Sequence, residues 1–311
     1  MRRGFVRKIP ALIVVAGLLA TLTACSTSAA PGSAGCTTPV SGDASNVVTA
    51  SGKFGSKPTV KLPTPIVTKH TEVSTLIQGH GQVLTDGTPT LIKYTIYSGA
   101  TGKVLSASSY GTPTTPITVG ATKGGPLVTA LECAQVGSRL AIAVKASDLT
   151  STTAKPNDKS GPAYIVVMDI VKAFLPKANG ALRVGVNNMP AVVTAANGAP
   201  GISVPDIAAP KTEKIQVIRQ GSGHTFTKKD TAVVQFTAVD WASSPKVQGS
   251  TWTDGDAATA LPLNSSQIPA SITKAIIGQQ VGSQVMVVVP PTAASGSSTS
   301  YIYVFDLLGS L

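Results

Sequence analysis

Hydrophobic residues along most of the chain fall in short runs that are typical of strands, and in Val73–Ile77 and Lys214–Arg219 they alternate with polar ones. The apolar residues of these runs are mainly β-branched or aromatic, as half-buried strands require. Two stretches differ, because Leu127–Cys133 and Ser271–Ile277 place apolar residues three and four apart after a proline. Each of these two predicts one short helix. Strands are predicted at Val73–Ile77, Thr90–Tyr97, Leu140–Val144, Tyr164–Phe174, Lys214–Arg219, Ala232–Asp240, Val285–Val289 and Tyr301–Leu308.

The chain also repeats itself at a spacing of about 140 residues. Three short motifs recur in the same order: Gln78–Gly81 as Gln220–Gly223, Ala134–Arg139 as Gln279–Gln284, and Met168–Val171 as Phe305–Leu308. We therefore predict an α+β fold of two tandem domains, each an antiparallel sheet wrapped on one short helix. The domains are expected at residues 46–176 and 199–311, joined by a linker over residues 177–198 that is rich in Pro, Gly and Asn.

The first residues have the features of a targeting segment. Basic residues occupy Arg2–Lys8, and an apolar run follows over Ile9–Leu22, too short to span a bilayer comfortably. The run ends in Leu22–Cys25, which resembles the bacterial lipobox, in which the cysteine becomes the lipid-modified first residue. We expect residues 1–24 to be a lipoprotein signal peptide, Cys25 the lipidation site and residues 25–45 a flexible tether. Ordinary secretory cleavage, with Cys25 incidental, is the alternative.

The charge of the chain does not indicate a nucleic-acid partner. The sequence has 25 Lys and Arg against 14 Asp and Glu, a formal charge of +11, yet only 13% of its residues are charged. Four of the positive charges lie in the segment that is expected to be removed, and the remaining excess is spread thinly. No later stretch combines clustered Lys or Arg with aromatic residues, as a nucleic-acid surface does.

Two cysteines remain beyond the expected cleavage point, Cys36 and Cys133. An even number of cysteines in an exported protein favours a disulfide, which would tie the end of the tether to the first domain. Two unrelated reduced thiols are the alternative.

Motifs for nucleophilic or metal-assisted chemistry are largely missing from the sequence. The only histidines are His70, His80 and His224, and no His/Cys spacing suits zinc. Ser271–Lys274 matches Ser-x-x-Lys of the penicillin-binding enzymes, but the companion motifs Ser-Asp-Asn and Lys-Thr-Gly are missing, so we interpret the match as chance. We expect no metal and no cofactor.

The second copy resembles the FKBP-type peptidyl-prolyl isomerases. The family's Gly-turn strand ending in Ile-Pro-Pro corresponds to Val281–Pro291, and its final strand to Tyr301–Gly309. Its Gly-x-Gly turn, Val-x-Tyr-Thr-Gly strand and Phe-Asp-Ser-Ser-Trp turn correspond to Gln220–Gly223, Val233–Thr237 and Gly249–Trp252. The match covers Glu213 to Leu311, and the first copy, Glu72 to Phe174, is similar to the family more faintly.

The resemblance implies a hydrophobic substrate pocket formed by Phe236, Ile268, Ile272 and Tyr303. Other family positions are lost: the pocket Phe and Asp fall at Gln248 and Gly249, the floor Trp falls at Ile272, and the Tyr after Pro-Pro falls at Ser295. Ordinary core is the alternative role for the four apolar residues. In the first copy core is favoured, since Val144-Lys145-Ala146 replaces the Val-Pro-Pro end.

The resemblance implies prolyl cis-trans isomerisation. Together with the N-terminal targeting segment, it predicts a monomer that acts on proline-containing exported polypeptides while a lipid anchor holds it outside the cytoplasmic membrane. Such catalysis needs no nucleophile, because a dry apolar pocket binds the twisted, less polar amide better than the planar one. Two alternatives stay open: a binding module or chaperone that kept the sheet and lost the pocket, and a purely structural spacer.

Overall fold

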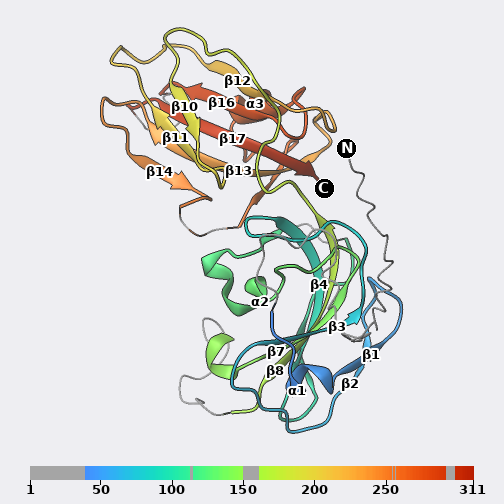
Figure 1. Cartoon of the computed structure of the whole chain (residues 1–311). Helices are drawn as coiled ribbons and strands as arrows, with labels where there is room; N and C mark the ends of the chain where they lie inside the picture. The colour runs from blue at the N-terminus through green and yellow to red at the C-terminus, as the bar shows by residue number, and fades with distance from the viewer. Residues whose placement is uncertain (1–38, 113–114, 150–160, 254, 256, 292–297) are drawn as a thin grey trace, which may run out of the picture. The chain divides into compact units, whose positions relative to one another are not determined.

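The first copy of the repeat forms one antiparallel sheet. The computed structural model describes residues 39–112, 115–149, 161–253, 255, 257–291 and 298–311. Within them the strands of the first sheet are arranged in the order β3-β7-β8-β4-β5, with β6 paired to β4 (Figure 1). Their bounds are β3 Glu72–Ile77, β4 Pro89–Ser98, β5 Val104–Ala107, β6 Ile117–Thr118, β7 Arg139–Val144 and β8 Tyr164–Ala173.

The second copy forms a sheet with the corresponding strand order, β14-β13-β17-β16-β12, which β9 extends beyond β12 and β15 extends beside β13. The cross-strand registers also correspond, since Tyr94 lies opposite Met168 in the first sheet and Phe236 lies opposite Phe305 in the second. The bounds are β9 Ala181–Leu182, β12 Lys214–Gln220, β13 Thr231–Asp240, β14 Val247–Ser250, β15 Thr259–Pro262, β16 Gln284–Val289 and β17 Tyr301–Ser310.

The repeated glycine motifs contact each other in both copies. Gly137 and Gly282 each have a φ of 93°, a left-handed conformation that favours glycine. The serine that follows each of them accepts a hydrogen bond from the first glycine of the Gly-x-Gly turn: Gly79 N to Ser138 Oγ at 3.0 Å, and Gly221 N to Ser283 Oγ at 2.9 Å. The two motifs of each copy therefore form one packed turn.

A short hairpin covers the second face of each sheet. The hairpin β1 (Thr49–Ser51)–β2 (Thr59–Lys61) packs on the first sheet, and β10 (Ala191–Thr194)–β11 (Pro200–Ser203) packs on the second. In β16 and β17 alternate residues point to opposite faces, so that Val285 and Phe305 lie on one side while Met286 and Val304 lie under the hairpin. Both faces are consequently buried along the central strands of each sheet, as the almost continuous burial of β7 and β16 indicates.

The predicted α+β class, with each sheet wrapped on one short helix, is wrong. Among the described residues there are seventeen strands in four antiparallel sheets, whereas the α-helices α1 (Asp43–Asn46), α2 (Gly125–Thr129) and α3 (Ala270–Ile276) have four, five and seven residues. The fold is therefore dominated by sheet. The reason is that α2 and α3 are too short to cover a sheet face, and the opposite face is covered by strands that the hydrophobic pattern did not reveal.

Parts of the predicted tether and linker take part in ordered structure. The helix α1 starts within the expected tether, and the Glu72 carboxylate accepts hydrogen bonds from Ala44 N at 2.8 Å and Ser45 N at 3.2 Å. The expected linker contains β9 and β10. The domain boundaries themselves stay a prediction. No helix in the described part of the chain is long and apolar enough to cross a membrane.

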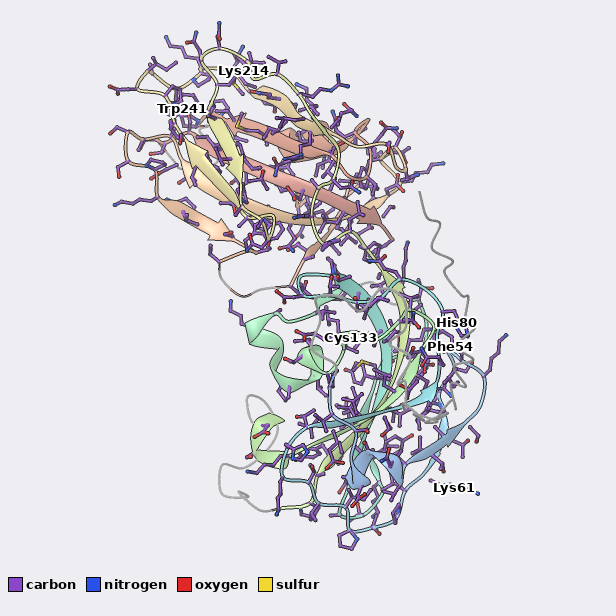
Figure 2. The ribbon with its side chains drawn as sticks, viewed as in Figure 1. Phe54, Lys61, His80, Cys133, Lys214 and Trp241 are labelled. Atoms are coloured by element: carbon purple, nitrogen blue, oxygen red, sulfur yellow. The ribbon has the colours of Figure 1, made fainter. Side chains whose placement is uncertain are left out.

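The signal peptide, Cys25 and Cys36 lie outside the described residues. Cys133, which follows α2 (Figure 2), is disulfide-bonded. Its pairing with Cys36 stays a prediction.

Candidate functional site

The four predicted pocket residues come together on one face of the second sheet. Phe236 lies on β13, Tyr303 on β17, Ile272 on α3, and Ile268 in the turn before α3. All four belong to or pack against one group of side chains, which we call the inner cluster. Its buried members are Phe226, Ala232, Val234, Leu263, Ile272, Ala275, Ile276, Val285, Val287, Phe305 and Leu307.

Three aromatic rings form the part of the inner cluster beside α3. The Phe305 ring lies between the other two, with its centroid 5.9 Å from that of Phe236 and 6.0 Å from that of Tyr303. The planes of Tyr303 and Phe305 are nearly parallel, at 6°, because the residues follow each other on the same face of β17. Phe305 was not among the predicted site residues, although its place two residues after Tyr303 on one strand was a signal for it.

Burial separates the four predicted residues into two groups. Ile272 is only 9% exposed and is a core residue, whereas Phe236, Ile268 and Tyr303 are half-buried and reach the surface. Burial raises the pKa of Tyr303 above its usual range, with a smaller effect in the same direction from Tyr301. Its hydroxyl is therefore neutral at physiological pH. Together the three side chains present an apolar surface with one neutral hydroxyl.

The positions where the FKBP pocket would have Phe and Asp lie on the edge strand β14. Gln248 is exposed there, and its amide contacts Asp240 Oδ2 at 3.5 Å and Lys246 O at 3.4 Å. Gly249 lies beside the Phe236 ring. Ser295 falls outside the described residues. Neither Gln248 nor Gly249 supplies a carboxylate at this edge of the second sheet.

Groups that could perform nucleophilic or metal chemistry are not assembled in the described part of the chain. All three histidines are exposed. His224 Nε2 lies 3.0 Å from Asp230 Oδ1, but Ser310 Oγ donates to that same carboxylate oxygen, at 2.9 Å, and not to the imidazole. Lys274 of the Ser-x-x-Lys match pairs with Glu213 at 2.8 Å on the surface. No group of three or more His, Cys, Asp or Glu among the described residues could hold a metal.

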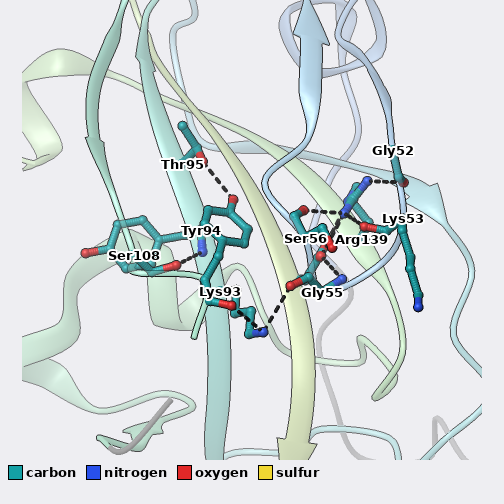
Figure 3. Close-up of polar contacts among 11 residues, drawn as sticks. Gly52, Lys53, Gly55, Ser56, Lys93, Tyr94, Thr95, Ser108 and Arg139 are labelled. Carbon is teal, nitrogen blue, oxygen red and sulfur yellow. Dashed lines mark hydrogen bonds and ion pairs between the residues drawn. The ribbon is translucent and has the colours of Figure 1, made fainter. Parts of the chain in front are cut away.

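The first sheet has a buried ion pair between two neighbouring strands, β7 and β8. Arg139 of β7 and Asp169 of β8 are 0% and 2% exposed, with Nε 2.6 Å from Oδ1 and Nη2 2.8 Å from Oδ2. The same guanidinium donates to the carbonyls of Gly52, Lys53 and Ser56, and Asp169 accepts from Gly55 N at 2.7 Å (Figure 3). The pair therefore holds the loop of the β1–β2 hairpin onto the sheet.

The second sheet keeps the acid of this pair but not the base. Asp306 is 1% exposed and accepts hydrogen bonds from Gln284 Nε2 and from Ala178 N, each at 2.8 Å. Burial raises the pKa of Asp306 to about 6, which those hydrogen bonds and the more distant Arg219 and Lys177 only partly offset. The two halves of the repeat thus differ in the charge of an otherwise matched buried site.

Solved structures that the chain resembles are FKBP-type proteins. A structure of the three FKBP domains of wheat FKBP73 matches 79% of this chain and 98% of its own, with 16% identity and a TM-score of 0.31. FkpA from Escherichia coli matches 38% of this chain and 51% of its own, at 20% identity and a TM-score of 0.28. A peptidyl-prolyl cis-trans isomerase of Pseudomonas syringae matches 35% of this chain and 82% of its own, at 14% identity and a TM-score of 0.27.

No protein-family model and no curated protein matches the sequence. At the identities and TM-scores of the solved structures, the likeness does not establish a family. What the described residues establish is an apolar, partly exposed aromatic cluster without an assembled nucleophile, base or metal site.

Proposed function

We propose that residues 199–311 form an FKBP-type peptidyl-prolyl cis-trans isomerase that acts, as a monomer, on exported polypeptides. One observation carries the proposal. Side chains from β13, β17, α3 and the turn before α3 meet in the inner cluster at the positions that the sequence resemblance assigned to a pocket. Three of them remain partly exposed, so a proline ring can contact them.

The reaction that this surface supports is rotation about an amide, with no bond made or broken. The barrier to rotation is about 18–20 kcal/mol, and uncatalysed isomerisation takes tens of seconds or more. Contact with the rings of Phe236 and Tyr303 removes water from the Xaa-Pro amide. Because the twisted amide is less polar than the planar one, this loss of water costs the transition state less than the ground state.

The test is a protease-free isomerisation assay, such as NMR exchange on a short Leu-Pro peptide. We expect the wild-type protein to accelerate exchange, and Phe236→Ala to lower kcat/KM by about tenfold or more through loss of an aromatic contact. Tyr94→Ala, at the equivalent position of the first sheet, is the matched control and should leave kcat/KM unchanged. Exchange at the uncatalysed rate with folded wild-type protein would rule out the enzyme.

A binding module without catalysis is a second candidate, favoured by the solvent-exposed Gln248 and the buried Ile272 at positions where the family has pocket residues. A binding module would capture unfolded clients and suppress their aggregation while leaving the rate of isomerisation unchanged. The same peptide assay combined with a binding titration separates the two functions.

We also propose that Cys25 carries a lipid that anchors the protein outside the cytoplasmic membrane. The ordered series of basic segment, apolar run and Leu-Thr-Ala-Cys supports the proposal. Metabolic labelling with palmitate is expected to label the wild-type protein and not Cys25→Ala. Equal labelling of both proteins, or none of the wild type, contradicts the anchor.

A further inference from the structure

Tyr303 breaks the correspondence between the two halves of the repeat. The shared motif matches Met168 to Phe305, and so Val166 to Tyr303. Val166 is fully buried in the core of the first sheet, whereas Tyr303 is half-buried at the rim of the inner cluster. A position that is pure aliphatic core in one half thus carries a polar group at the surface in the other.

The Tyr303 hydroxyl is available to a ligand. Its ring is held by parallel contact with Phe305, so few rotamers remain to be frozen on binding. Within the described part of the chain, the hydroxyl makes no hydrogen bond to the protein. It is also not buried, so it is in contact with solvent. Burial of the ring raises the pKa of the group, so it stays a donor at neutral pH.

The chemistry of amide rotation restricts which substrate oxygen can accept from this hydroxyl. A donor on the oxygen of the rotating Xaa-Pro amide favours the charge-separated, planar form and so opposes rotation. A donor on a neighbouring peptide carbonyl has no such effect, because that amide stays planar throughout. A hydrogen bond there contributes equally to the ground state and the transition state.

We propose that the Tyr303 hydroxyl donates a hydrogen bond to the carbonyl oxygen of the substrate's proline residue itself, and thereby fixes the peptide on the inner cluster. This inference rests on the proposed isomerase and names a substrate-binding group of that site. In this role Tyr303 replaces the polar anchor that Gln248 and Gly249 do not supply. The hydrogen bond raises the affinity for the peptide and does not change the rate of amide rotation.

The test compares Tyr303→Phe with wild type on the same Leu-Pro peptide. The ring and its contact with Phe305 are kept, so thermal unfolding should be unchanged. We expect KM and the peptide Kd to rise about three- to tenfold, the size of one net hydrogen bond, with kcat unaltered. Tyr94→Phe, which removes a hydroxyl at the position of the first sheet that is equivalent to Phe236, is the matched control and should change neither constant.

Each outcome decides between the inference and its basis. An unchanged Kd in folded Tyr303→Phe, an equal rise in Tyr94→Phe, or a fall in kcat at constant KM overturns the role of the hydroxyl. Wild-type protein that binds the peptide without accelerating exchange overturns the proposed isomerase, and the Kd of Tyr303→Phe then still decides whether the hydroxyl anchors the peptide. Wild-type protein that neither binds nor accelerates overturns both.

Discussion

Replacing Arg139 by alanine is expected to lower the free energy of unfolding by about 3–5 kcal/mol. The substitution leaves the Asp169 carboxylate buried without its cation, and it removes the donors that bind the carbonyls of Gly52, Lys53 and Ser56. An uncompensated buried charge is costly, since the protein interior solvates it poorly. Urea denaturation followed by far-UV circular dichroism measures the loss.

The second half of the repeat supplies the matched control for this prediction. Arg139→Gln creates in the first sheet the Gln–Asp arrangement that Gln284 and Asp306 have in the second. We expect it to cost less than Arg139→Ala, because the amide restores one donor to the carboxylate. A loss below about 1 kcal/mol in Arg139→Ala would show that the ion pair does not hold the β1–β2 loop.

The protein is expected to lose about 2 kcal/mol of stability through Asp306 alone as the pH rises from about 4 to about 7. The pKa of Asp306 is raised by burial from 3.8 to about 6, so between these values the folded state binds a proton that the unfolded state has released. Its contribution is therefore fully present below the unfolded pKa and is lost as the pH passes through the folded pKa. Unfolding free energies from urea titrations across this range measure the effect.

Asp306→Asn isolates this contribution from that of the other carboxyl groups. The amide oxygen can still accept from Ala178 N, but the group no longer ionises. The difference in stability between wild type and variant should therefore change with pH in this window. Hydrogen bonds from Thr227 lower the pKa of Asp230. Asp230 therefore contributes stability that is lost as the pH falls, which is opposite to the effect of Asp306. A wild-type minus variant difference that is flat from pH 4 to pH 7 contradicts the raised pKa.

The long strands could be predicted from the sequence because they are rich in β-branched and aromatic residues. Thr90–Tyr97 and Ala232–Asp240 lie within or coincide closely with β4 and β13. The two hairpins could not be predicted in this way, since each of their strands has only three or four residues and little contrast between its faces. That missing layer is also why the predicted α+β class was wrong.

The candidate site shows the same limit. A family resemblance named Phe236 and Tyr303, but the place of Phe305 between their rings depends on strand register, which local sequence does not contain. The Arg139–Asp169 pair likewise depends on the alignment of β7 with β8, thirty residues along the chain. Burial then decided that Ile272 is core while Tyr303 reaches solvent.

The order of the covering hairpins along the chain has a consequence for folding. Each hairpin precedes the long strands that it covers, so β1–β2 is synthesised well before β7 and β8, against which it packs. A two-stranded ribbon is marginal in water on its own. In each half, the hairpin can pack only after strands far along the chain have formed. Such contacts between distant residues give a high contact order, which is typical of slowly folding β proteins.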